Sequence, residues 1–191
     1  MLILINALII KGNMMVNKLE KSFNSFSQLI KRPQTIIQAE NRVKSGWDNL
    51  SDLPFGKRVF SYLVGKTAPY SGNIKAQIEE LRPGFAKVLL RDRSSIRNHI
   101  KSIHAVALAN LAELAGNIAL SYSLPENSRF IVAKMDIDYI KKARGDIYAT
   151  SHCPIPKTNK RKEYTVLVEI YNAQGELLCK ASLVSLVGPN S

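Results

Sequence analysis

Residues 98–120, NHIKSIHAVALANLAELAGNIAL, decide the fold that this sequence predicts. From His104 onward the stretch is almost entirely Ala, Leu, Val and Ile, with small residues on every side of a helical wheel and one carboxylate, Glu113. Alanine favours a helix, and a helix that is apolar all round is expected to be buried all round. Such a thin helix, about five turns long, requires a sheet that wraps around it.

Strand-like segments stand on both sides of this helix. Residues 74–81 and 85–90 are joined by the turn Arg82-Pro-Gly84, which is typical of a hairpin. After the helix, alternating apolar residues predict four more strands, at 129–139, 146–153, 163–171 and 176–187. This order predicts an α+β domain in which a curved antiparallel sheet wraps around one central helix.

The first 54 residues predict a helical arm, and residues 55–191 the domain itself. Residues 15–30 carry apolar side chains at helical spacing with lysines elsewhere, which indicates a basic amphipathic helix. It either packs on its own domain or a second subunit, or lies on an anionic membrane surface. The apolar start, residues 1–12, is a poor signal peptide because no basic residue precedes it. A short helix is expected at 57–65.

Composition limits the partners and the chemistry. The 191 residues carry a formal net charge of +12, which attracts anionic partners. Two cysteines and three histidines form neither a disulfide framework nor a metal-ligand pattern, so we expect a reduced, cytoplasmic protein without a metal. No apolar run approaches the length of a membrane span. Aromatic residues are not interleaved with basic ones as nucleic-acid binding requires.

Three motifs carry a resemblance to a known family. They are APYSGNIKAQIEEL at 68–81, RNHIKSIHAVALANLAELAG at 97–116 and DYIKKARGD at 138–146. In this order they resemble the hotdog fold of acyl-CoA thioesterases, in the branch typified by the phenylacetate-pathway enzymes. The chain looks most similar to an uncharacterised bacterial group of thioesterase-like hotdog proteins. The resemblance covers residues 55–187.

The resemblance implies a thioester-hydrolysing site at the interface of a homodimer, or of a tetramer built from dimers. Glu113 would be the general base towards water or the nucleophile, and Asn98 would hold the water or the acyl group. His104 would open the helix, and the backbone N–H of Ala105 would polarise the thioester carbonyl. Neither a metal nor a redox cofactor is implied, and coenzyme A enters only as part of the substrate.

Two departures from the family pattern leave alternatives open. Relatives have His-Gly-Gly where this chain has His104-Ala105-Val106, so it is either a thioesterase or a hotdog protein that binds an acyl-CoA or a fatty acyl group without turnover. The second departure is the basic cluster Lys141, Lys142 and Arg144. It either contacts the phosphates of coenzyme A or is an ordinary solvated loop.

Overall fold

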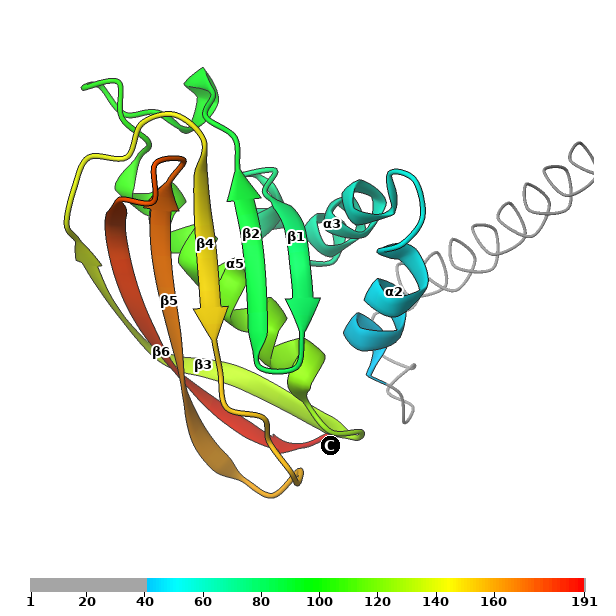
Figure 1. Cartoon of the computed structure of the whole chain (residues 1–191). Coiled ribbons are helices and arrows are strands. Elements are labelled where there is room, and N and C mark those ends of the chain that lie inside the picture. Colours follow the sequence, from blue (N-terminus) through cyan, green and yellow to red (C-terminus); the bar gives the residue numbers. More distant parts are fainter. Residues whose placement is uncertain (1–40, 191) are drawn as a thin grey trace, which may run out of the picture.

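The structure, a computed structural model, describes residues 41–190 (Figure 1). Three short helices lead into the domain, and one long helix lies at its centre. In chain order the elements are α2 (Arg42–Leu50), α3 (Gly56–Thr67), α4 (Pro69–Gly72), β1 (Gln77–Arg82), β2 (Phe85–Leu90), the 3-10 turn η1 (Ser94–Ile96), α5 (Ala105–Ser123), β3 (Ser128–Tyr139), β4 (Ile147–His152), β5 (Lys162–Asn172) and β6 (Leu177–Pro189).

The six strands form one antiparallel sheet in the order β1-β2-β4-β5-β6-β3. Figure 1 shows the sheet curving around α5, which crosses behind the strands. The predicted α+β hotdog fold is confirmed. The hairpin between β1 and β2 turns at Gly84, whose φ of 74° favours glycine.

Helix α5 packs into the sheet because its small residues allow a close approach. At Gly116 an added Cβ would stand 3.2 Å from a methyl group of Leu183 and 3.3 Å from Val166. The expectation that α5 is buried all round is wrong on one side. Val106 is 53% exposed, and Glu113 and Asn117 are half-buried, because the sheet covers only the opposite face of the helix.

The expectation that no segment has the length of a membrane span also needs correction. By length and composition α5, within the described residues, is long and apolar enough to cross a bilayer. The core helix of a globular domain passes the same test, and α5 is mostly buried inside the curved sheet. Its apolar character is therefore accounted for by the core.

The predicted start of the first strand differs from the structure. Pro69–Gly72 forms the single turn of α4 before it. Strand β1 begins at Gln77 rather than at residue 74, because Lys75 has a φ of 47° and interrupts the extended backbone. Ile74 is still buried, so its side chain reaches the core from a loop.

The helices before β1 share the core of the domain. Trp47 and Phe60 are buried and meet edge to face, with ring centroids 5.2 Å apart. The side-chain amide of Asn41 donates to the carbonyls of Ser121, Tyr122 and Leu124 at 2.6–3.1 Å, and so caps the end of α5. The amphipathic helix predicted at 15–30 lies outside the described residues, and the domain boundary after residue 54 stays a prediction.

The two edges of the sheet differ in what bonds to the edge strand. Along β1, Ser61 Oγ of α3 accepts a hydrogen bond from the Ile78 N–H at 2.8 Å, and Lys57 Nζ donates to the Glu79 carbonyl at 2.6 Å. At the other edge β3 pairs with β6 only, and no described strand continues the sheet. Half-buried apolar side chains line β3: Phe130, Val132, Met135 and Ile137.

Candidate functional site

The start of α5 presents an unpaired backbone donor. His104 is the N-cap, and its Nδ1 accepts a hydrogen bond from the Val106 N–H at 3.1 Å. The His104 N–H donates to the Ile96 carbonyl at 2.8 Å, which fixes the entry of the chain. Within residues 41–190 the Ala105 N–H has no acceptor. The positive end of the helix dipole adds to this donor, so the position favours an oxyanion.

Asn98 lies beside the helix start. Arg97 and Ile103 form an isolated antiparallel bridge, which brings Asn98 next to Ser102. Asn98 Oδ1 accepts hydrogen bonds from the Ile100 N–H, the Ser102 N–H and the Ser102 hydroxyl, each at 3.1 Å. Its acceptor is therefore occupied, and its side-chain NH2 group remains as a donor. This arrangement suits a contact to a carbonyl oxygen better than the acceptance of a proton from water.

A cavity of about 240 Å³ opens next to His104. Asn110 lines it and is 7% exposed; its Nδ2 donates to the Tyr70 carbonyl at 3.3 Å, but its Oδ1 is buried without a donor among the described residues. An unsatisfied buried carbonyl oxygen is costly, so this atom indicates a ligand or water that donates to it. The cavity is lined by Tyr70, Asn73, Ile74, Ser95, Ile96, Arg97, His104, Val106, Ala107 and Asn110.

Glu113 belongs to a polar stripe on the face of α5 that the sheet does not cover. Asn110, Glu113 and Asn117 are spaced three and four residues apart, so they share one face. Asn117 Oδ1 is also buried without a donor in the described part of the chain. The sequence analysis missed both asparagines, although their helical spacing around Glu113 was the signal that identifies them.

The predicted site residues do not all meet in one subunit. Ala105 and Glu113 stand eight residues apart on the same helix, which separates them by about 12 Å along its axis. Asn98, His104 and Ala105 do lie together at the start of that helix. Glu113 lies apart from them.

The basic loop lies close to the same helix end. The Ile103 N–H donates to the Ala143 carbonyl at 2.9 Å, and the Tyr139 hydroxyl donates to the Ala105 carbonyl at 3.2 Å. Lys141 is paired with Glu176, which offsets its charge. Lys142 and Arg144 are exposed and form no ion pair within residues 41–190, so their charges are available to an anion.

Cysteine and metal chemistry find no support in the described structure. Cys179 is fully buried, and burial raises the pKa of its thiol to about 11. Burial also raises the pKa of Cys153. Both thiols therefore stay protonated near neutral pH and are weak nucleophiles. In the stretch from 41 to 190, no three His, Cys, Asp or Glu side chains are grouped to hold a metal ion.

Comparison with known proteins identifies the family. The family model described as a domain of unknown function, DUF4442, matches residues 56–187. The chain belongs to the DUF4442 family. No curated protein matches it.

Several solved structures are similar to this DUF4442 protein. The structural-genomics target APC5556 is 30% identical, with a TM-score of 0.65 over 78% of this chain and 97% of that one. A Pseudomonas aeruginosa protein of unknown function, described as a probable thioesterase, is 22% identical, with a TM-score of 0.62 over 72% and 97%. A thioesterase from Haemophilus influenzae is 15% identical, with a TM-score of 0.56 over 63% and 82%. The last two share the fold.

Proposed function

We propose that this protein is an acyl-CoA thioesterase that works as a homodimer and hydrolyses an acyl thioester to a carboxylate and free coenzyme A. One observation carries the proposal: the unpaired Ala105 N–H, at the positive end of α5, opens beside a cavity in which Asn110 Oδ1 lacks a donor. An oxyanion donor beside a polar cavity is what thioester hydrolysis requires. The fold that carries it is shared with thioesterases.

In the proposed reaction a water attacks the thioester carbonyl carbon. The Ala105 N–H and the Asn98 side-chain NH2 donate to the carbonyl oxygen as its negative charge develops. The partner's Glu113 takes the proton from the attacking water, because the Glu113 of the same chain is about 12 Å away along the helix. The carbon–sulfur bond then breaks, and the thiolate of coenzyme A leaves and is protonated.

The open edge of the sheet supports the homodimer. Within residues 41–190, strand β3 is unpaired on its outer side, and it carries the exposed Ile131 as well as half-buried apolar side chains. Such an edge pairs readily with another strand, and a second copy of β3 around a two-fold axis would continue the sheet. Lys142 and Arg144 would contact the phosphates of coenzyme A, because they lie by the start of α5 with free charges.

The test uses two variants, one without the Ala105 N–H and one without the Glu113 carboxylate, the two groups that the proposed site takes from different subunits. Ala105→Pro removes the N–H donor, and the fold tolerates it because proline suits the first helical position and His104 is already extended at φ −65° and ψ 140°. Glu113→Gln removes the base. Release of thiol from a panel of acyl-CoAs should fall by about 100-fold or more in each variant.

Mixing the two variants should then restore turnover. If each site takes one residue from each subunit, random pairing makes half of the dimers mixed, and each of these has one intact site, which gives about a quarter of the parent activity. Ala105→Pro mixed with the double variant Ala105→Pro/Glu113→Gln is the control and should stay inactive. If the two single variants exchange subunits and the mixture stays inactive, the site is not shared between subunits. If Glu113→Gln is active, Glu113 is not the general base.

A second function rests on the side chain of Val106. It is 53% exposed and lines the same cavity, at a position where the thioesterase branch that the sequence resembles usually has glycine, and so it narrows the approach to the Ala105 N–H. The alternative is a hotdog protein that binds acyl-CoA without turnover. Calorimetric binding of acyl-CoA by a parent protein that releases no thiol from any member of the panel would favour this alternative over the thioesterase.

A further inference from the structure

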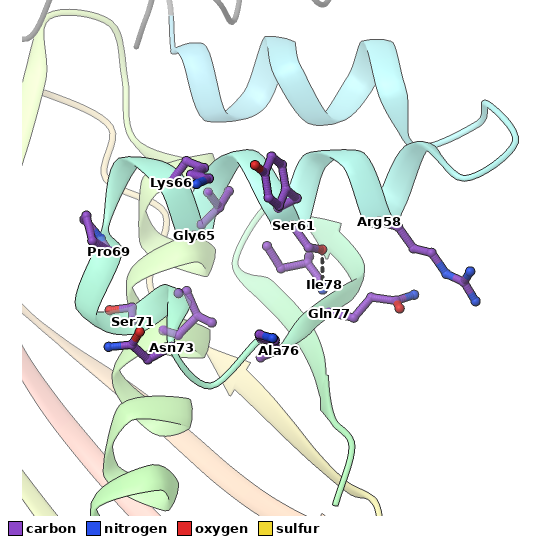
Figure 2. Close-up of a pocket in the computed structure, with 15 residues that line it drawn as sticks. Arg58, Ser61, Gly65, Lys66, Pro69, Ser71, Asn73, Ala76, Gln77 and Ile78 are labelled. Carbon is purple, nitrogen blue, oxygen red and sulfur yellow. Dashed lines mark hydrogen bonds between the residues drawn. The ribbon is translucent and has the colours of Figure 1, made fainter. Parts of the chain in front are cut away.

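A second and larger cavity lies beside α4. It has a volume of about 690 Å³ and is lined by residues of α3, α4, the start of β1 and one residue of α5 (Figure 2). Apolar side chains from α3, from the start of β1 and from α5 line it: Val64, Ala76, Ile78 and Leu114. Its volume lies within the range of pockets that hold small ligands, roughly 300–1,000 Å³.

Two glycines hold the wall of this cavity in place. Helices α3 and α4 cross at Gly65 and Gly72, and a Cβ added at Gly72 would stand 2.4 Å from the Gly65 carbonyl oxygen. A Cβ added at Gly65 would stand 3.1 Å from the Gly72 Cα. The two backbones are therefore in direct contact. Because the backbones of α3 and α4 already touch, these helices cannot move closer together and close the cavity.

The cavity is positively charged at its rim. Arg58, Lys66 and Lys75 line it and are exposed, and among the described residues that line it there is no Asp or Glu. Figure 2 shows Arg58 and Lys66 on the two ends of α3, with Ala76 and Gln77 from the strand side between them. None of the three cations forms an ion pair in the described structure. An apolar interior under an unpaired cationic rim is complementary to an anion with a hydrocarbon chain.

We propose that this cavity binds a long-chain carboxylate, with the hydrocarbon chain against Val64, Ile78 and Leu114 and the carboxylate at the cationic rim. The cavity is distinct from the candidate site, because its only shared lining residue is Asn73. The proposal does not depend on hydrolysis, since a free fatty acid is the ligand. A fatty acyl thioesterase would release such an anion close to this cavity.

Binding of dodecanoate and of the uncharged dodecanol to the full chain, each measured by calorimetry, tests the proposal. The triple variant Arg58→Gln/Lys66→Gln/Lys75→Gln should weaken the binding of dodecanoate by about tenfold or more and leave the binding of dodecanol unchanged. Val64→Phe, or Ala76→Leu if the first variant fails to fold, should weaken both because it fills the cavity. The matched control Lys157→Gln/Lys160→Gln/Arg161→Gln removes the same charge from an exposed loop and should change neither.

Three outcomes overturn the proposal. The first is no binding of dodecanoate by the parent protein, the second is unchanged binding when the cavity is filled, and the third comes from a variant of the candidate site. Ala105→Pro separates this cavity from the proposed function: it abolishes thioester hydrolysis but should leave dodecanoate affinity unchanged. Loss of dodecanoate binding in Ala105→Pro would assign the fatty acid to the candidate site instead.

Discussion

The two edges of the sheet differ in what completes them. The β1 edge is closed by the chain itself, since Ser61 and Lys57 of α3 bond to backbone groups of that strand. The β3 edge has a long unpaired side with apolar side chains on it. The difference teaches that this sheet can be extended in one direction only. Substitutions near β1 should therefore change stability, and substitutions on β3 should change association.

The largest effect is expected where α2 and α3 close the β1 side. Trp47→Ala removes a buried indole that packs on Phe60, and we expect the free energy of unfolding to fall by about 3–5 kcal/mol. Urea denaturation followed by circular dichroism measures it. Phe55→Ala, at an exposed aromatic position a few residues away, is the matched control and should change stability by less than about 0.5 kcal/mol. If Trp47→Ala changed the free energy of unfolding as little as Phe55→Ala, α2 would not belong to the core.

A smaller loss is expected at the crossing of α3 and α4. Gly72→Ala places a Cβ 2.4 Å from the Gly65 carbonyl oxygen, so the helices must separate, at a cost of about 1–3 kcal/mol in the free energy of unfolding. Gly188→Ala is the control, because its added Cβ meets only the flexible side chain of Arg161. The same denaturation experiment compares them. If Gly72→Ala left the free energy of unfolding unchanged, α3 and α4 would be able to adjust to the added Cβ. The wall of the large cavity would then not be rigid.

Periodicity explains why so much of the fold could be predicted. The run of small apolar residues after His104 specifies a thin buried helix, and alternation around Gly84 specifies a hairpin. What could not be predicted depends on contacts distant in sequence. The left-handed backbone at Lys75 delays β1, and nothing in its side chain indicates that conformation. Which edge of the sheet stays open depends on the strand order, which no local pattern encodes.

The candidate site was predictable in part. The apolar run after His104 indicated where the helix begins, and the structure shows His104 as its N-cap, accepting a hydrogen bond from the Val106 N–H. Asn110 and Asn117 were not predicted, because apolar periodicity does not mark them, although polar residues at the same spacing carry equal information. The roles of Asn98, Ala105 and Glu113 came from resemblance and stay predictions. The mixing experiment tests those of Ala105 and Glu113.

The third prediction concerns association at β3. Ile131→Asp puts a charge on an exposed side chain, 67% accessible, at the open edge. In a two-fold dimer the charge enters both copies of the interface, so the dimer dissociation constant should rise by about tenfold or more. Light scattering after size exclusion measures it. Leu167→Asp on the inner strand β5, 55% exposed, is the matched control and should leave the dimer intact. If both variants dissociated the dimer, the interface would lie on the face of the sheet and not at the β3 edge.

The last prediction concerns thiol labelling beside β3. Cys179 on β6 pairs with Tyr139 of β3 and is buried, with a pKa raised to about 11 by that burial. At pH 8 its alkylation should be roughly a hundredfold slower than in the unfolded chain, because less of the thiol is ionised and the reagent cannot reach it. The residual reaction requires β3 to open from the edge.

Pairing with a second copy would hold β3 in place, so the labelling of Cys179 should slow as the protein concentration rises through the dimer dissociation constant. Cys153 provides the internal control. It follows β4 and its backbone N–H donates to Gly84 at the β1–β2 turn, away from the open edge. Its labelling should therefore be independent of protein concentration. Mass spectrometry after digestion resolves the two cysteines in one sample. If Cys179 and Cys153 respond alike, the protection comes from the whole fold, and β3 is not the edge that association covers.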